Sequence, residues 1–196
     1  MSFAFIFLVT GTIGAWLFGT KVTGMLLPVY GVSFNQLNAY FHLDSITVTK
    51  QRGQRFVTVE AITQGARVID GRKVPDGITV SASTLAGHGM QPFIILFCAI
   101  PLWPAKTRSE YLVIALASLF MFIMIQAIDT PLVLSGALED MVLYSFTQDQ
   151  LTSSPLVQGM HFMNSGGRLA LSLMGVGLVR VIQLCLCRDC RDGVSR

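Results

Sequence analysis

Charged residues are scarce in this chain of 196 residues. Asp, Glu, Lys and Arg together make up 13% of it, whereas a soluble domain usually contains about 25%. Hydrophobic residues make up 52%, and the mean hydropathy is +0.60. This balance disfavours an ordinary soluble domain and predicts an integral membrane protein. The formal net charge of +3 is also too small to predict a nucleic-acid partner.

Cysteine is scarce as well, and the first residues lack the basic group that opens a secretory signal peptide. One cysteine lies in an apolar run (Cys98) and three lie near the end (Cys185, Cys187 and Cys190). This spacing does not predict the disulfide framework of a small secreted domain. The opening stretch MSFAFIFLVTGTIG also shows no clear small-x-small cleavage site. We therefore expect it to remain as a membrane anchor.

Three long apolar runs are present, and each is long enough to cross about 30 Å of hydrocarbon. They cover residues 3–20, 111–128 and 169–186. A fourth run at 92–103 is too short to cross alone. It is either a thin fourth span or a re-entrant segment.

Between the first run and the short one, the hydrophobic pattern changes to alternation. The stretches SITVTK, RFVTVEAIT, ARVIDGRKV and GITVSAST are rich in β-branched residues at every second position. Asp70-Gly71 is a suitable two-residue hairpin turn. The pattern predicts an antiparallel sheet of three or four strands over about residues 44–84.

The predicted fold is therefore a mainly α-helical membrane protein with three to four transmembrane helices and a small extracytoplasmic antiparallel β segment. The predicted parts are an N-terminal anchor (1–28), a β-rich segment (29–88), transmembrane helices 2–4 with an outer loop at 129–167 (89–187), and a cytoplasmic tail (188–196). In the outer loop we expect an amphipathic helix on the membrane surface. Its apolar residues are Leu132, Leu138, Met141, Val142 and Tyr144.

Lys and Arg are distributed unevenly among the loops, and cytoplasmic loops are enriched in them. Residues 130–167 contain neither, whereas the linker before the third span contains Lys106 and Arg108, and the tail contains further arginines. The loop is thus predicted outside, and the linker and tail inside. Four spans then place the β segment outside. Lys21, at the outer end of the first span, favours an alternative with three spans, a cytoplasmic β segment and no crossing at 92–103.

Two sets of residues in the predicted spans are candidates for helix packing. Gly11, Ala15 and Gly19 form a stripe of small residues on one face of the first span. Such a stripe lets helix backbones approach closely, against either this chain or another protein. Asp129 and Arg168 stand at the outer ends of two spans. They are candidates for an interhelical ion pair, and the alternative is that each faces headgroups.

The tail cysteines Cys185, Cys187 and Cys190 admit three interpretations. C-x-C-x-x-C offers three ligands, whereas a structural zinc site has four. Reversible acylation at the membrane edge is the second interpretation. The favoured one is an inert cluster at the membrane edge.

Two short segments near the predicted outer surface, GHGM and GMHFMN, combine methionine with histidine. Thioether and imidazole ligands suit Cu(I), although ordinary interfacial residues are the favoured interpretation. The residues are His88, Met90, Met160, His161 and Met163. No G-x-S-x-G, P-loop or G-x-G-x-x-G motif is present. The sequence therefore predicts no catalytic, cofactor-binding or metal-binding residue.

The order of these parts, and the stretch GMQPFIILFCAIPLWPAKTR at 89–108, resemble the small polytopic membrane proteins of bacterial exosortase systems. Those systems sort and process surface or exported proteins. The resemblance implies an accessory role and a multi-pass location in the bacterial cytoplasmic (inner) membrane. The sorting enzymes carry a membrane-embedded Cys, Arg and His. Cys98 has no matched Arg and His, so no catalytic residue is carried over.

We therefore expect a non-enzymatic accessory or assembly subunit of a bacterial membrane complex. Its expected partners are other integral membrane proteins and the lipid bilayer, with no nucleic acid and no cofactor. Two alternatives stay open. One is a membrane-embedded, transpeptidase-like enzyme using Cys98, and the other is a copper-handling protein at the periplasmic face.

Overall fold

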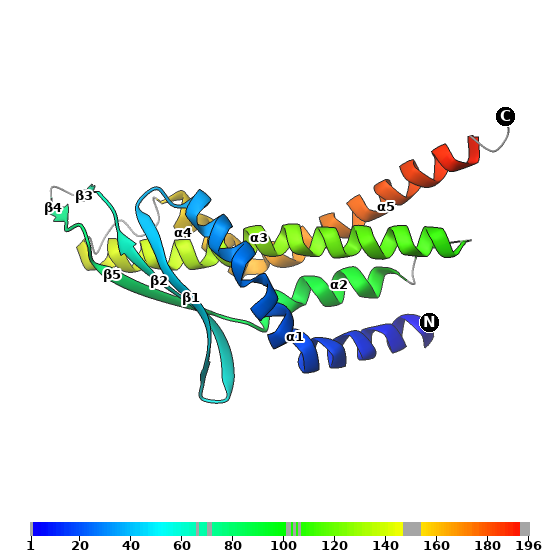
Figure 1. The fold of residues 1–196 in the computed structure, drawn as a ribbon, viewed down its shortest axis with the longest axis horizontal. Helices are drawn as coiled ribbons and strands as arrows, with labels where there is room; N and C mark the ends of the chain where they lie inside the picture. Colours follow the sequence, from blue (N-terminus) through cyan, green and yellow to red (C-terminus); the bar gives the residue numbers. More distant parts are fainter. Residues whose placement is uncertain are drawn as a thin grey trace. The chain divides into compact units, whose positions relative to one another are not determined.

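The computed structural model describes residues 2–65, 67–69, 72–100, 103, 105, 107–146 and 154–192. These residues are mainly helical and include a three-stranded antiparallel sheet and a separate two-stranded hairpin (Figure 1). The helices are α1 (Ser2–Leu37), η1 (His88–Met90), α2 (Gln91–Ala99), α3 (Arg108–Phe146), α4 (Pro155–Phe162), η3 (Met163–Gly167) and α5 (Arg168–Asp192). The strands are β1 (Phe41–Gln51), β2 (Gln54–Thr63), β3 (Arg67–Ile69), β4 (Arg72–Val74) and β5 (Thr79–Leu85).

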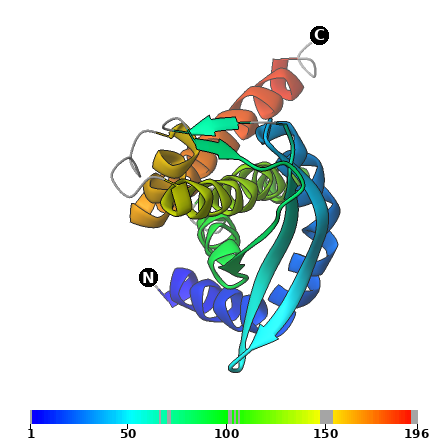
Figure 2. The same ribbon diagram turned by 90° about the vertical axis from the view of Figure 1, so that its left-hand side faces the viewer.

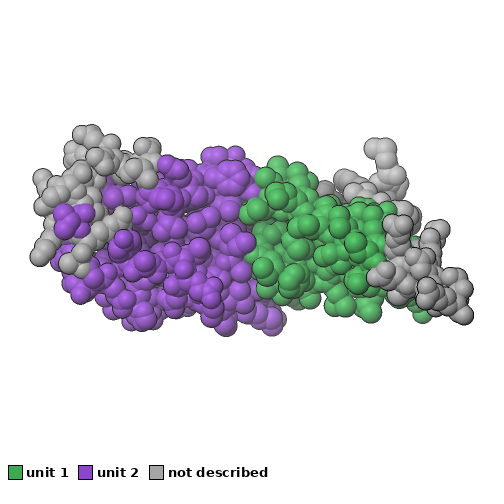
Figure 3. Space-filling model, turned by 90° about the horizontal axis from the view of Figure 1, so that it is seen from above, with its two compact units in different colours: residues 1–18, 90–125, 168–196 green, residues 19–89, 126–167 purple. Residues whose placement is uncertain are grey.

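The chain divides into two compact units (Figure 3). Both α1 and α3 contribute residues to each unit. Unit 1 comprises Met1–Phe18, Met90–Ile125 and Arg168–Arg196. Unit 2 comprises Gly19–Gly89 and Gln126–Gly167. In the described residues, the secondary structure of unit 1 is entirely helical, and every strand belongs to unit 2.

The predicted sheet is confirmed, with a modified strand set. Three antiparallel strands pair in the order β1-β2-β5, and the stretches SITVTK, RFVTVEAIT and GITVSAST supply them. The stretch ARVIDGRKV instead forms a separate two-stranded hairpin, β3-β4. Its predicted turn residues, Asp70 and Gly71, lie outside the described residues.

Alternation in the central strand β2 sorts its side chains between two faces. Val57, Val59 and Ala61 are buried, whereas Glu60 between them is exposed. Successive residues of a strand point to opposite faces of the sheet, so the apolar residues of β2 share one face. In Figures 1 and 2 the sheet runs along one side of the C-terminal half of α3.

The prediction of a separate surface helix in the outer loop is correct about the helix but wrong about its being separate. Its residues are helical, but they continue α3, which runs without interruption through Pro131 to Phe146. Leu134, Leu138 and Val142 are buried in this part of α3, so it is a central helix of unit 2. Helical spacing of apolar residues is the same whether protein or lipid covers the apolar face, and the sequence pattern does not distinguish the two.

Two described helical segments are long and apolar enough to cross a membrane. They are Arg108–Ser145, with a mean hydropathy of 2.4 in its most apolar window, and Pro155–Leu186, with 2.0. Only 33% and 22% of those windows is buried. A core helix of a soluble protein is mostly covered by its own chain, and these segments are mostly uncovered.

The second of these segments is bent between α4 and α5. Gly166 has φ 117° and ψ −2°, which lies outside the helical region. A residue with a side chain rarely adopts such a positive φ, so glycine permits this change of direction. The bend separates α4 in unit 2 from α5 in unit 1.

Candidate functional site

A cluster of buried polar side chains lies in unit 2 where residues of α1, η1 and α3 come together. We call it the polar cluster. It consists of Tyr30, Gln126, Asp129 and Thr130, all at most 5% exposed, and the backbone of Gly89. Buried polar groups are stable only when they are hydrogen-bonded, so the bonds within the cluster determine how these segments meet.

The side-chain amide of Gln126 is the centre of the polar cluster. The Tyr30 hydroxyl donates a hydrogen bond of 2.7 Å to its Oε1 atom, and the Thr130 hydroxyl donates to the same oxygen at 3.4 Å. The Nε2 atom of Gln126 donates to the backbone carbonyl of Gly89. Both ends of the amide therefore have partners, and one side chain links α1 and η1 to α3.

Tyr30 lies beyond the predicted span 3–20. Its hydroxyl is protonated at neutral pH. Burial is the main cause that raises the pKa of Tyr30 to about 12. The hydrogen bond with Thr130 lowers the pKa, and the nearby Asp129 carboxylate raises it. The hydroxyl consequently stays a hydrogen-bond donor to Gln126.

Gly89 is the point at which backbone approaches the amide most closely. A Cβ atom added to Gly89 would lie 2.9 Å from Oε1 of Gln126. Real Cβ atoms do not come so close to an oxygen without displacement. The glycine that opens the stretch GMQPFIILFCAIPLWPAKTR therefore has a packing role in the polar cluster.

A second polar contact joins α1 to α3 further along both helices. The Nδ2 atom of Asn38 donates to the Ser135 hydroxyl at 2.7 Å and to the Phe34 carbonyl at 2.8 Å. The Asn38 Oδ1 atom is buried and has no hydrogen-bond partner among the described residues. With the polar cluster, this contact fixes the C-terminal part of α1 on α3 at two points.

The chemistry offered by the polar cluster is that of a clamp. An amide, a phenol and a hydroxyl bond to one another and to a backbone carbonyl. These bonds tie side chains of α1 and α3 to one another and to the backbone of η1. Within the described ranges, no group of three or more His, Cys, Asp or Glu side chains could hold a metal ion.

A close glycine contact joins α3 to α4 within unit 2. A Cβ on Gly136 would lie 2.5 Å from the Met160 Cβ and 2.6 Å from the Leu156 carbonyl oxygen. On the opposing helix, a Cβ on Gly159 would lie 3.1 Å from a methyl carbon of Leu132. Each helix therefore presents a glycine to the other, which lets the two backbones approach closely. The sequence shows a glycine inside each of these helical segments, but the sequence analysis did not predict a contact between them.

The predicted small-residue stripe divides between the two units. Gly11 in unit 1 faces α2, because a Cβ on it would lie 3.7 Å from the Cys98 Sγ atom. Ala15 is half-buried. Gly19 belongs to unit 2, is buried, and accepts a hydrogen bond of 2.8 Å from the Thr23 hydroxyl. At Gly11 the neighbour of the stripe is therefore a helix of this chain, and not another protein.

Asp129 and Arg168 are both buried, at 1% and 6% exposure. A buried charge is costly unless it is paired or hydrogen-bonded, so burial argues against two side chains that simply face headgroups. The two residues belong to different units. Their ion pair stays a prediction.

The His and Met residues considered for copper differ in exposure. In GMHFMN, Met160 and Met163 are buried and His161 is exposed. In GHGM, Met90 is buried and His88 is exposed. The thioethers and the imidazole of GMHFMN therefore do not share one environment.

The cysteines are spread over two helices of unit 1. Cys98 on α2 is half-buried, and Cys185 on α5 is exposed. The side chains of Cys187 and Cys190 lie outside the described residues. The interpretation of the tail cysteines stays a prediction.

The polar cluster is the feature that the sequence interpretation missed. Gln126 was visible as the one strongly polar residue in the run 111–128, but its partners Tyr30 and Gly89 are far away in sequence.

Compared with known proteins, the chain matches no family model, and neither a curated protein nor a solved structure is significantly similar to it.

Proposed function

We propose that this protein is a non-enzymatic accessory or assembly subunit of a bacterial membrane complex. In this proposal the long apolar helices cross the inner membrane, and the β segment lies on the outer side of that membrane. The observation that carries the proposal is the apolar surface that the helices of unit 1 present outward.

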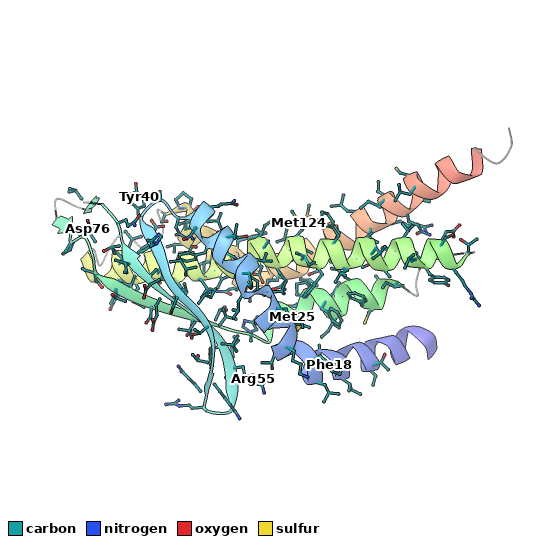
Figure 4. The ribbon with its side chains drawn as sticks, viewed as in Figure 1. Phe18, Met25, Tyr40, Arg55, Asp76 and Met124 are labelled. Atoms are coloured by element: carbon teal, nitrogen blue, oxygen red, sulfur yellow. The ribbon has the colours of Figure 1, made fainter. Side chains whose placement is uncertain are left out.

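The outward surface of unit 1 is made of large apolar side chains on three helices. Soluble monomers rarely expose such contiguous apolar patches, and lipid or a partner helix is the environment that suits them. Phe18 and Met124, labelled in Figure 4, are two of these residues. The others include Ile13 and Leu17 on α1, Leu112, Leu116, Leu119 and Phe120 on α3, and Leu169, Leu173, Met174, Leu178, Val181, Leu184 and Leu186 on α5.

Unit 2 supports a topology with four crossings. Asn38, just after α1, is hydrogen-bonded to Ser135 on α3. Phe41 and Thr63 of the sheet line the same small hollow as Val142 of α3. Segments in direct contact lie on the same side of a membrane. Two crossings between β5 and the C-terminal half of α3, one of them including residues 92–103, would agree with these contacts.

The ranges of unit 1 agree with this topology. Its three segments, Met1–Phe18, Met90–Ile125 and Arg168–Arg196, contain most of each predicted span. Unit 2 includes the segment 130–167, which has no Lys or Arg. Such a segment is typical of the side opposite the cytoplasm.

The exposed face of α5 offers a contact surface for another membrane protein. Gly177 lies on this face between Met174, Leu178 and Val181, which are all exposed. Nothing lies within 4 Å of a Cβ atom added to Gly177. A glycine between large apolar residues leaves room for a partner backbone, which is how transmembrane helices associate without a hydrophobic drive.

The link to surface-protein sorting rests on the order of the parts and on the stretch at 89–108. In this chain the stretch combines a glycine packed against Gln126 with the short apolar helix α2. A subunit of this type would hold a sorting enzyme or its substrate at the membrane without reacting with either. The partner is accordingly another integral membrane protein.

Two glycines on α5 allow a direct test of assembly. Gly177→Leu adds bulk to the open face. Gly175→Leu adds it where a Cβ would already lie 3.1 Å from Ile125 and 3.3 Å from Leu96. We expect Gly177→Leu to leave the unfolding temperature of the chain unchanged and to lose partners that co-purify in mild detergent. Gly175→Leu should lower the unfolding temperature. If Gly177→Leu retained every co-purifying protein, the α5 face would not be the assembly surface.

The topology is tested separately with single cysteines at Gln64 and Gln158 in a background without the four native cysteines. Both positions are exposed residues of unit 2. An impermeant thiol reagent should label both in intact cells. Labelling at Gln158 without Gln64 would support the three-span alternative instead.

A further inference from the structure

The tip of the β1–β2 hairpin concentrates positive charge. Lys50, Arg52 and Arg55 are all exposed there, and residues 45–59 contain no Asp or Glu. Figure 4 shows Arg55 at the end of the hairpin that points away from the helices of unit 2. None of the three side chains belongs to the buried face of the sheet, so the packing of unit 2 does not require them.

Two of these charges lie directly opposite each other. Lys50 pairs with Arg55 in the register of β1 and β2. Paired residues of an antiparallel ladder point to the same face with their Cβ atoms about 5 Å apart, and like charges in such a pair repel. No acidic residue within the tip offsets this repulsion. An anionic group from outside the hairpin would remove it.

The turn between β1 and β2 contains a second unfavourable feature, which is the backbone conformation of Arg52. Arg52 has φ 49° and Gly53 has φ 80°, which are the positive values of a type I′ turn. Asn or Gly is the usual residue at the first of these positions. Among the described residues, Arg52 is the only one other than glycine with a positive φ. A residue held in a sparsely populated conformation is a reason to look for a function, and here the side chain supplies a charge.

The path of β1 brings this tip back toward the start of the α1 segment that belongs to unit 2. At the start of β1, Leu43 lies beside α1, because its N–H is 3.3 Å from the Asn35 Oδ1 atom and a Cβ on Gly31 would lie 3.2 Å from its side chain. From Leu43 to Gln51 the strand covers about 26 Å at ~3.3 Å per residue. From Gly31 back to Gly19 the helix covers about 18 Å. The strand runs back along α1 (Figure 1), so the tip reaches the level of Gly19.

We propose that the hairpin tip formed by Lys50, Arg52 and Arg55 docks on the anionic phosphate headgroups of the membrane in which the chain is embedded. The first predicted span ends at the level of Gly19, and the exposed Lys21 lies just beyond it. Guanidinium groups bind phosphate through paired hydrogen bonds. The contact ties the sheet to the bilayer surface. The proposal rests on the membrane embedding of unit 1, but it does not depend on a partner protein.

The test uses the full chain in bilayer discs of pure lipid, with the four native cysteines replaced. A single cysteine at Gln54, in the tip, carries a polarity-sensitive dye. A matched cysteine at Gln64, which follows the other end of β2, is the control. Discs of phosphatidylglycerol are compared with discs of phosphatidylcholine. The dye at Gln54 should shift to the blue and become less accessible to an aqueous quencher in phosphatidylglycerol only, and the dye at Gln64 should not respond.

The charge-removing variant is Lys50→Gln, Arg52→Asn and Arg55→Gln. Arg52→Asn gives the turn its preferred residue pair, so a loss of response cannot come from a weaker hairpin. Each basic residue near an anionic surface is worth about a fivefold change in partitioning, and three are worth up to about a hundredfold. The lipid response should therefore disappear in this variant, and high salt should weaken it in the unchanged chain.

Three results would contradict the proposed contact or the membrane embedding on which it rests, and they can be told apart. A Gln54 dye that behaves alike in both lipids, in a chain firmly incorporated in the discs, would overturn the headgroup contact and leave the proposed function intact. A chain that is extracted from cell membranes by alkaline carbonate would overturn the embedding on which both proposals rest. A response that persists in the charge-removing variant would also overturn the contact, because it would then be independent of these charges.

Discussion

The Tyr30 hydroxyl and Oε1 of Gln126 are joined by a hydrogen bond of 2.7 Å across 96 positions of sequence. Both side chains are buried, at 1% and 0% exposure. Because Gln126 also donates to the carbonyl of Gly89, this one amide holds three segments of unit 2. The polar cluster therefore links side-chain chemistry directly to the tertiary structure of unit 2.

Removing either partner of this bond should destabilise the protein, but to different extents. Tyr30→Phe deletes one donor, and Oε1 of Gln126 keeps Thr130, so the expected loss is about 0.5–1.5 kcal/mol. Gln126→Leu removes the acceptor Oε1 from the Tyr30 hydroxyl, which keeps Thr130, and also removes the amide that donates to the buried Gly89 carbonyl. The loss should therefore be larger, at about 1–3 kcal/mol for the carbonyl alone. Denaturant unfolding in detergent micelles measures both. Tyr111→Phe, at an exposed tyrosine, is the neutral control. A loss for Tyr30→Phe that equals the loss for Gln126→Leu would contradict the central role of the amide.

Gly89→Ala should be destabilising because of Gln126. The added methyl would lie 2.9 Å from Oε1, and overpacking of this kind typically costs about 1–3 kcal/mol. The cost should shrink when Gln126 is also changed to Ala, which removes the clashing atom. A double-mutant cycle of unfolding free energies gives this coupling. Gly87→Ala is a matched control, since nothing lies within 4 Å of its Cβ position. Equal costs of Gly89→Ala in the two backgrounds would show that its neighbour is not the cause.

Gly136→Ala should separate α3 from α4. Its Cβ would lie 2.6 Å from the carbonyl oxygen of Leu156, and backbone cannot move aside as a flexible side chain does. We expect a loss of at least about 1–3 kcal/mol. Gly24→Ala, on α1 with nothing within 4 Å, should be neutral or stabilising by up to about 1 kcal/mol, because alanine favours helix. The thermal unfolding midpoints of the two variants measure the difference. The contact would be incidental if both variants unfolded together with the unchanged chain.

The face of α1 that contains Gly11 should tolerate a methyl group but not a larger side chain. A Cβ at Gly11 would lie 3.7 Å from the Cys98 Sγ atom, which is an ordinary contact distance. Gly11→Ala should therefore be nearly neutral, and Gly11→Leu should cost about 1–3 kcal/mol. Gly14→Leu, which meets open space, and Phe18→Leu, at an exposed position, are the controls. The half-life of each variant in the membrane is the measurement. Similar half-lives for the two leucine variants at Gly11 and Gly14 would argue against the contact with α2.

The amino-acid sequence by itself determined the local features of this protein. Scarcity of charge and long apolar runs predicted long apolar helices, because hydropathy along a run depends only on the residues in it. Alternation in RFVTVEAIT predicted β2 for the same reason, since the period of a strand is local. Gln126 was recognisable as an unusual residue in its run, although not as the centre of a cluster.

Only the tertiary structure decided what those elements contact. The continuation of α3 through Pro131, the separation of β3-β4 from the main sheet, and the burial of Leu134 and Leu138 depend on neighbours that are distant in sequence. Tyr30, Gly89 and Gln126 carry no shared sequence signal, because a hydrogen bond between separate segments requires only that the fold bring a donor to an acceptor. The two glycines of α5, Gly175 and Gly177, differ in their packing for the same reason. Gly175 is packed and Gly177 is open. Two positions on one helix differ in packing only once the neighbouring helices are in place.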